Sequence, residues 1–79
     1  MTKDEMRENI KNNLIDLRVE RDVTQLRLAN ILEKSPNAVA SWEQGLSLPD
    51  VTTLYRLSLY YNVTMEYFYK NHRKEGEEE

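Results

Sequence analysis

The stretch from Ser35 to Gly45, SPNAVASWEQG, reads as a short helix with both of its ends marked. Ser35 can accept a hydrogen bond from a free amide of the first turn, and Pro36 lacks the N–H that would go unbonded there. Gly45 suits the left-handed conformation that closes many helices. The residues between are mostly small, and none is a lysine or an arginine. The sequence therefore predicts a helix over residues 35–44 that presents small side chains without positive charge.

Helical spacing of apolar residues continues on the N-terminal side of this stretch. Apolar residues three and four positions apart predict an amphipathic helix over about residues 5–21. A short break at Asp22 follows, and Asp tolerates the left-handed conformation better than most residues do. Thr24 can then cap a second helix over residues 24–34. The inner face of that helix would consist of Leu28, Ala29 and Leu32.

On the C-terminal side, residues 46–50 predict a loop, and Asp50 can favour the start of a fourth helix. The inner face of this helix would consist of Leu54, Leu57 and Tyr61. Thr64 can cap a last helix over residues 65–71. No segment alternates polar and apolar residues for long enough to predict a strand. The predicted fold class is therefore all-α, a compact bundle of five short helices around one core.

Composition limits the class of protein. A chain of 79 residues is close to the lower limit for a self-sufficient core, so dimerisation or a larger parent protein is a fair expectation. The chain has no cysteine, which excludes disulfides and thiolate metal sites. The polar N-terminus contains no signal peptide, and no apolar run is long enough to span a membrane. We therefore expect a cytoplasmic protein.

Net charge is unfavourable for a nucleic-acid binder. The chain carries 11 basic and 14 acidic residues, which gives a formal net charge of −3. Part of the acidic excess lies in NHRKEGEEE, residues 71–79, which reads as a disordered charged tail. Without this tail the chain is close to neutral. We therefore expect one folded domain over residues 1–70, followed by the tail.

Nothing in the sequence indicates an enzyme. The chain has one histidine, His72, which lies in the predicted tail without carboxylates at a catalytic or metal-binding spacing. With only two glycines, the chain has no glycine-rich loop for a phosphate. We therefore expect no catalytic activity, no cofactor and no metal.

The order and spacing of the residues above resemble the Cro/phage-repressor-type (Xre) helix-turn-helix family over nearly the whole chain ahead of the tail. The resemblance implies a lambda-repressor-like DNA-binding domain whose second and third helices form the helix-turn-helix. In the turn, Glu33 and Lys34 stand where the family usually has a glycine and an aliphatic residue. The residues that carry the resemblance are Leu17, Arg18, Thr24, Gln25, Leu28, Ala29, Leu32, Ser35, Val39, Trp42, Glu43, Gly45, Pro49, Leu54, Leu57, Val63, Thr64 and Phe68.

The resemblance places the helix over residues 35–44 in the major groove of double-stranded DNA, where its first residues would read base edges. The implied base-reading residues are Pro36, Asn37, Ala38 and Ser41. Asn37 can bond N6 and N7 of adenine, and small apolar side chains can contact the thymine methyl group, which predicts a preference for A·T pairs. The alternative is that the small residues serve close packing, which we prefer for Ala40.

Phosphate contacts are expected around the same two helices. By the resemblance, Gln25 would bind a phosphate with its backbone amide and side chain. Glu43 would pair with Arg18, which joins the first helix to the third and leaves guanidinium donors for a phosphate. The other expected phosphate ligands are Arg21, Arg27, Lys34, Trp42 and Gln44. The alternative is a solvated surface with ion pairs one turn apart for the cations, and a place at the edge of the core for Trp42.

Aromatic residues gather near the end of the predicted domain. A small core cannot enclose all of them, and exposed aromatic side chains are common in protein interfaces. We therefore predict Tyr60, Tyr67 and Tyr69 as candidate dimer-interface residues. The alternative is that they cover the edge of the core and keep their hydroxyls in water.

The expected function is sequence-specific transcriptional regulation by a repressor that binds an inverted-repeat operator as a homodimer. The alternative is a protein-interaction module, antitoxin-like or anti-repressor, that uses the same fold to hold a protein partner. Asn37 and Ser41 would matter for the first function, whereas Tyr67 and Tyr69 would matter for the second.

Overall fold

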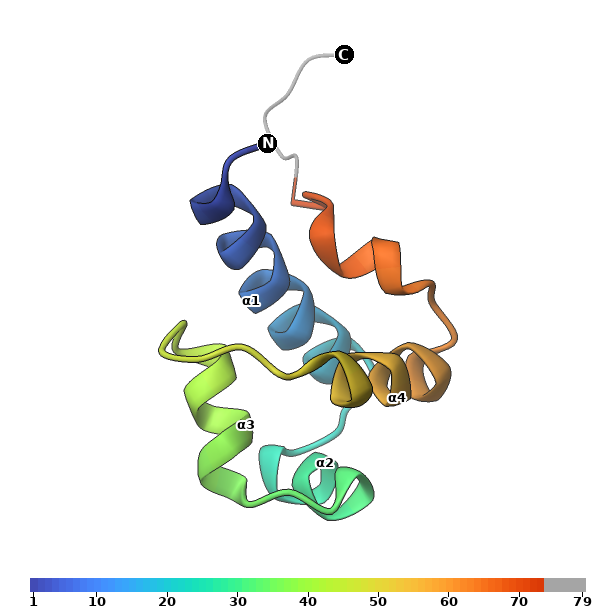
Figure 1. Ribbon diagram of the computed structural model, residues 1–79. Helices are drawn as coiled ribbons and strands as arrows, with labels where there is room; N and C mark the ends of the chain where they lie inside the picture. Colours follow the sequence, from blue (N-terminus) through green and yellow to red (C-terminus); the bar gives the residue numbers. More distant parts are fainter. Residues whose placement is uncertain (74–79) are drawn as a thin grey trace.

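The computed structural model describes residues 1–73, which form four α-helices and one 3₁₀ helix and contain no strand (Figure 1). The predicted all-α class and the order of five short helices are confirmed. The last helix is a 3₁₀ helix and ends two residues before the predicted end. The elements are α1 (Lys3–Glu20), α2 (Gln25–Leu32), α3 (Pro36–Glu43), α4 (Val51–Tyr61) and η1 (Met65–Tyr69).

Each helix begins at a side chain that caps it. The predicted capping residues Thr24, Ser35, Asp50 and Thr64 all accept a hydrogen bond from the backbone amide three residues later. The first helix begins earlier than predicted, at Lys3, because Thr2 and Glu5 form a reciprocal capping box. The hydrogen bonds from the backbone and side chain of Thr2 lower the pKa of the Glu5 carboxyl.

Left-handed residues end the helices. The backbone φ angles are 61° at Asp22, 59° at Glu33, 59° at Asn62 and 78° at Gly45. Asp22 and Gly45 thus adopt the predicted conformation. Glu33 adopts it too, so α2 ends at Leu32, two residues earlier than predicted, because a left-handed residue cannot continue the helix.

Arg56 of α4 stabilises this end of α2. Its Nη1 and Nη2 atoms donate to the carbonyl oxygens of Leu32 and Ile31, at 2.9 and 3.2 Å. The last carbonyl groups of a helix lack hydrogen-bond donors within the helix and carry partial negative charge. A guanidinium at this end supplies both the donors and a positive charge. The sequence pattern gave no signal for this contact, because it joins two different helices.

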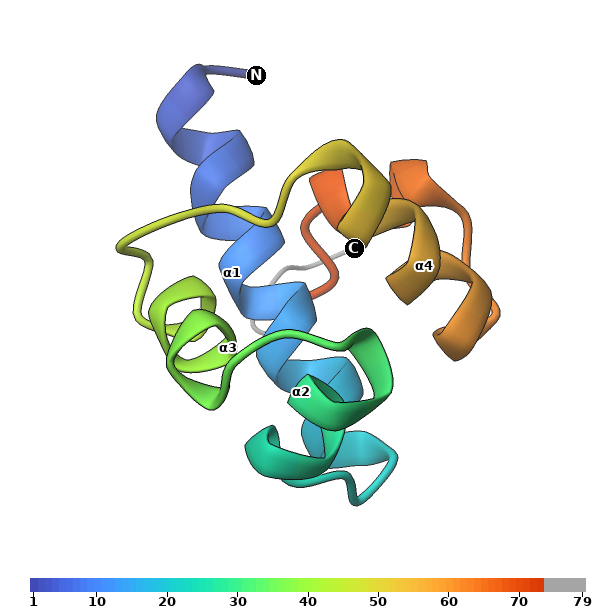
Figure 2. The same ribbon diagram turned by 60° about the horizontal axis from the view of Figure 1, so that its bottom comes forward.

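Helix α3 and the 3₁₀ helix η1 pack against α1, the longest element, and α2 packs against α3 and α4 (Figure 1). Figure 2 shows α2 and α3 side by side, joined by a tight turn, with α4 beyond α2. The 3₁₀ helix η1 lies alongside α1 and also contacts α4. The predicted inner-face residues of α2 and α4 are all buried. The most deeply buried large side chains are Leu14, Leu28, Leu32, Val39, Leu57, Tyr61 and Phe68.

Asparagine side chains of α1 hold η1 in place. The Nδ2 atom of Asn13, which is 3 % exposed, lies 2.8–3.1 Å from the carbonyl oxygens of residues 67, 68 and 70. Asn9 donates in the same way to the carbonyl oxygen of Tyr69, at 2.9 Å. These carbonyl groups therefore bond to α1 and not to a continuing α-helix, which explains why the last helix is short.

The first residues of the predicted tail contact the folded domain. The Arg73 guanidinium donates to both carboxylate oxygens of Asp16, each at 2.7 Å, and this pairing lowers the pKa of Asp16. The His72 ring stacks on Tyr67 with centroids 3.8 Å apart. The rest of the tail, residues 74–79, lies outside the described residues, so the predicted domain boundary and disorder stay predictions.

Candidate nucleic-acid interface

Helix α3 is fixed on one side and exposed on the other. Val39 is fully buried and Trp42 is 6 % exposed, so these two side chains anchor the helix in the core. At the N-terminal end, Pro36 and Asn37 are exposed, whereas Ala38 is half-buried against the core. Of the predicted base-reading residues, Pro36 and Asn37 therefore have the most accessible side chains.

Ser41, the fourth predicted base-reading residue, is half-buried and already has a partner. Its hydroxyl oxygen lies 2.8 Å from that of Ser47, in the loop after α3. A hydroxyl has one donor and two acceptor positions, so Ser41 retains hydrogen-bonding capacity. Ser47 was not anticipated from the sequence, since nothing in a lone serine of a loop marks such a partner.

A buried polar network joins α3 to α1 and α2. Arg18 donates to Glu43 through Nε and Nη2, at 2.6 and 3.0 Å, and their side chains are only 16 % and 8 % exposed. The same Glu43 accepts a hydrogen bond from the Gln25 side chain at 2.9 Å. The hydrogen bond to this carboxylate raises the pKa of the Arg18 guanidinium. The network fixes the end of α3 relative to the start of α2.

These contacts limit which groups of the network remain available to a ligand. The third nitrogen of Arg18, Nη1, donates to the carbonyl oxygen of Val23 at 2.8 Å, so all three nitrogens bond within the protein. The Gln25 side chain is also occupied. Its backbone amide lies in the first turn of α2, where amides have no partner within the helix.

The predicted phosphate-binding cations differ in their surroundings. Arg21 donates to the carbonyl oxygen of Tyr61 at 3.0 Å, and its guanidinium carbon lies 5.5 Å from the centre of the Tyr61 ring. The Arg21 side chain is therefore directed toward the end of α4. Arg27 and Lys34 are exposed and form no ion pair with any residue in the range 1–73. Gln44, which caps the end of α3, is exposed as well.

The three tyrosines predicted for a dimer interface are only partly exposed. Tyr60 is 40 % exposed and packs edge-on against Tyr61, while Tyr67 and Tyr69 are half-buried against the core. Three apolar side chains elsewhere on α4 are more exposed, as are others on α1, α2 and the loop after α3. The three on α4 are Val51, Tyr55 and Leu59, which are 71 %, 53 % and 63 % exposed.

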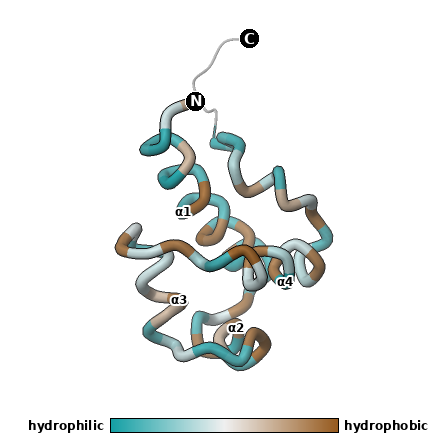
Figure 3. The backbone as a smooth tube through the Cα atoms, viewed as in Figure 1, coloured by the Kyte–Doolittle hydropathy of each residue, from teal (hydrophilic) through white to brown (hydrophobic). Residues whose placement is uncertain are grey.

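The sequence itself indicates that Val51, Tyr55 and Leu59 share one face of α4. The three residues are spaced four apart, which places them on one side of a helix. Figure 3 shows hydrophobic segments in the loop that leads into α4 and in α4 itself. The prediction of interface residues from aromatic content therefore missed these three side chains.

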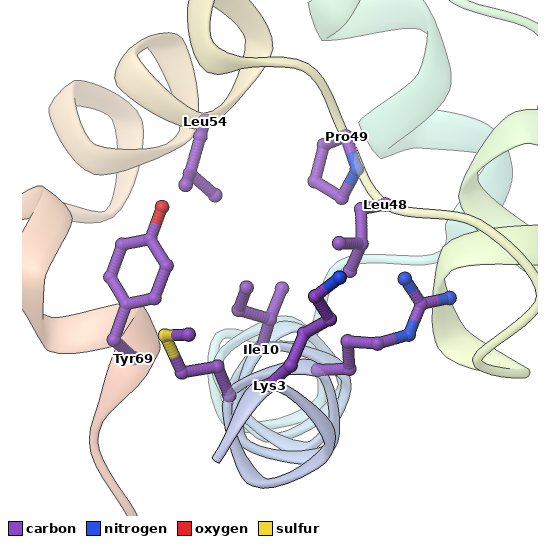
Figure 4. A pocket seen from close by; sticks show the side chains of 8 residues that line it. Lys3, Ile10, Leu48, Pro49, Leu54 and Tyr69 are labelled. Carbon is purple, nitrogen blue, oxygen red and sulfur yellow. The ribbon is translucent and has the colours of Figure 1, made fainter. Parts of the chain in front are cut away.

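A hollow of about 290 Å³ lies between α1, the loop before α4, and η1 (Figure 4). Ile10, Leu54, Pro49 and Tyr69 surround it with apolar surface, and Lys3 lies at its edge. This volume is just below the range of about 300–1,000 Å³ that is usual for ligand sites. Its lining has no carboxylate, histidine or cysteine, so it offers no catalytic pair.

Over residues 1–73, no helix has the length and apolar character needed to cross a membrane. The same part of the chain holds no group of three or more His, Cys, Asp or Glu side chains that could bind a metal ion.

Comparison with known proteins identifies the family. The helix-turn-helix family model HTH_3 matches residues 14–68. The solution structure of the SOS-response transcriptional repressor LexA from Eubacterium rectale is similar, with a TM-score of 0.82 at 22 % identity, covering 100 % of this chain and 84 % of that chain. At this identity the likeness shows the fold. A search of curated proteins gave no match. The chain therefore belongs to the helix-turn-helix family of Cro/phage-repressor (Xre) type, a family of DNA-binding transcription regulators.

Proposed function

We propose that this chain is a sequence-specific repressor of transcription that inserts α3 into the major groove of double-stranded DNA. The observation that carries the proposal is the exposed Asn37 in the first turn of α3, a helix fixed from behind by Val39, Trp42 and the Arg18–Glu43 pair. A rigid helix with an exposed N-terminal end is what major-groove readout requires. The repressor named in the structural comparison supports the direction of regulation.

Base readout would rest on small contacts. Asn37 would bond adenine at N6 and N7, and Pro36 and Ala38 would contact thymine methyl groups. Ser41 would use the hydrogen-bonding capacity that its contact with Ser47 leaves free. We therefore expect an operator whose contacted core is rich in A·T pairs, with each good Asn–adenine match contributing about 1–3 kcal/mol of discrimination.

Phosphate contacts would come mainly from the groups without partners in the structure. The amides at the start of α2, including that of Gln25, point out of the helix and suit an anion. Arg18, Arg21 and Trp42 would contribute less, because they are bonded within the protein or buried. The exposed side chains proposed as phosphate ligands are Arg27, Lys34 and Gln44. With so few cations, affinity should be weak for a monomer, so we propose a homodimer on an inverted repeat.

The test is selection from a pool of randomised duplexes at about physiological salt, with Asn37→Ala selected in parallel. The expected result is an inverted repeat with half-sites about one helical turn apart, which the variant no longer enriches at the adenine position. Asn30→Ala, at an exposed asparagine of α2, is the matched control and should select the original sequence. A motif unchanged in the Asn37 variant would contradict readout by α3.

A second candidate function is binding of a protein partner through the same fold. It is favoured by the exposed apolar side chains of α4 and by the absence of lysine and arginine from α3. Failure to enrich any duplex sequence, together with stable folding of the protein used, would favour this candidate over the repressor.

A further inference from the structure

The hollow between α1, the loop before α4 and η1 has an apolar lining that reaches the core (Figure 4). Two of its lining residues, Ile10 and Leu54, are only 5 % and 3 % exposed. The other apolar walls are Met6, Leu48, Pro49 and the ring of Tyr69. Because three separate segments of the chain enclose it, the hollow is concave, as sites for small molecules usually are.

The charged residues of the lining are both basic. Lys3 and Arg7 are four residues apart on α1, which places them on the same side of the helix. Both are exposed, and neither forms an ion pair with any residue of the described range 1–73. Figure 4 shows the Lys3 side chain extending along the edge of the hollow toward Leu48. The edge of an apolar hollow therefore carries two cations of the same sign.

The acidic residues of α1 do not account for these cations. Asp4 and Glu8 are absent from the lining and border another hollow, which Arg7 also borders, and Glu8 pairs with Lys11 at 3.2 Å. Lys3 is the first residue of α1, where the partial positive charge of the helix end disfavours a cation. Its charge is thus not explained by the stability of α1, and an anion bound in the hollow would offset it.

Tyr69 adds a neutral polar group on the opposite side from Leu48 and Pro49. Its hydroxyl is directed toward Leu54 (Figure 4). Within the part of the chain that the structure describes, this hydroxyl forms no hydrogen bond. A phenol can both donate and accept, so it is available to orient an occupant.

The size and charge of the hollow define its occupant. An apolar cavity of about 150 Å³ holds one benzene ring, so about 290 Å³ suits a body of roughly two fused rings. A carboxylate suits the edge, since it can accept charge-assisted hydrogen bonds from both an ammonium and a guanidinium. We propose that this hollow binds a small organic carboxylate, with its apolar body against Ile10, Leu54 and Pro49 and its carboxylate bonded to Lys3 and Arg7.

The test follows backbone amide signals of the isotopically labelled full chain by NMR while four probes are added. The probes are naphthoate, its neutral amide naphthamide, the cation naphthylmethylamine, and acetate, which lacks the apolar body. We expect naphthoate to cause saturable shifts of amide signals around the hollow, with a dissociation constant on the order of 1 mM. The other three probes should bind at least about tenfold more weakly, because each lacks either the carboxylate or the rings.

Two single variants and one control assign the charge preference to the edge. Lys3→Gln and Arg7→Gln should each weaken naphthoate binding about threefold or more and leave naphthamide binding unchanged. Both residues are exposed, so both variants should retain the spectrum of the folded protein. The matched control is Lys70→Gln, which removes the same charge from an exposed residue outside the lining and should bind naphthoate like the wild type.

Three results would overturn the proposal. Equal affinity for naphthoate and naphthamide would mean that the cations do not select an anion. Shifts that do not saturate, or that centre on another surface, would mean that the hollow is not a binding site. Equal weakening in Lys70→Gln and the two edge variants would reflect net charge alone. None of these measurements involves DNA, so each result leaves the proposed repressor function to its own test.

Discussion

Helices α3 and α4 are alike on the inside and opposite on the outside. Both bury an apolar face in the same core, through Val39 and Trp42 in one and Leu54 and Leu57 in the other. Outward, α3 presents Pro36 and small polar residues, whereas α4 presents large apolar side chains. The inner faces therefore determine the fold, whereas the outer faces differ in what they suit. The outer face of α3 suits a polar groove, and that of α4 suits another protein.

The two helices also differ in how their buried polar groups are satisfied. Beside α3, the Arg18–Glu43 pair bonds at every nitrogen and both carboxylate oxygens. At the end of α4, the Tyr61 hydroxyl is buried and has no hydrogen-bond partner among the described residues. Removal of the Glu43 carboxylate should thus be costly, whereas removal of the Tyr61 hydroxyl should be nearly free.

The largest effect is expected from breaking the anchor of α3. In Glu43→Ala the Arg18 side chain, which is only 16 % exposed in the wild type, loses its carboxylate partner, and this should lower the free energy of unfolding by about 3 kcal/mol. Urea denaturation at neutral pH measures this. The control is Glu66→Ala, which removes an exposed pair with Lys70 and should cost less than about 0.5 kcal/mol. Equal losses in both variants would contradict a structural role for the buried pair.

The next effect concerns η1, which supports α4 and makes no comparable contact with α3. Asn13→Ala removes the amide that bonds the carbonyl oxygens of residues 67, 68 and 70, at a cost of about 2 kcal/mol. Asn9→Ala, which removes one such bond, should cost about 1 kcal/mol or less. Thermal unfolding of the two variants compares them directly. A larger loss for Asn9→Ala would show that the number of carbonyl groups does not control the anchoring of η1.

Sequence reasoning succeeded where one residue type acts on its own helix. Capping by Thr24 and Asp50, closure by Gly45 and the buried spacing of α2 and α4 all follow from local chemistry. It missed contacts that join distant segments. Asn13 and Arg56 bond to carbonyl groups of other helices, and neither spacing nor propensity signals such a partner. The roles of Asn37 and Ser41 stay predictions, because a fold does not reveal which base a side chain contacts.

A smaller and oppositely directed effect is expected at Tyr61. Because its hydroxyl has no partner, Tyr61→Phe should leave stability at pH 7 unchanged or slightly higher. Burial raises the pKa of Tyr61 to about 12. Because the pKa is raised on folding, the contribution of Tyr61 to stability is fully present below pH 10 and is lost as the pH rises toward 12. The variant should therefore gain about 1 kcal/mol relative to the wild type at pH 11. A variant that is less stable at pH 7 would show that the hydroxyl is bonded.

The smallest expected effect is a difference in pH dependence between the residues that cap α4 and α3. Asp50, which caps α4, has a lowered pKa because its carboxylate accepts a hydrogen bond from the Thr53 amide. Because the pKa is lowered on folding, the contribution of Asp50 to stability is present above its pKa in the unfolded chain. It is lost as the pH falls through its pKa in the folded protein. Asp50→Asn keeps a capping oxygen that does not titrate. The free energy of unfolding of this variant should therefore fall less than that of the wild type between pH 5 and pH 2.5. Ser35, which caps α3, has no charge to lose, so Ser35→Ala should shift the urea midpoint equally at both pH values. If the shift of the urea midpoint in Ser35→Ala changed with pH, a neighbouring carboxylate would be interacting with the start of α3. The starts of α3 and α4 would then not differ in their electrostatics.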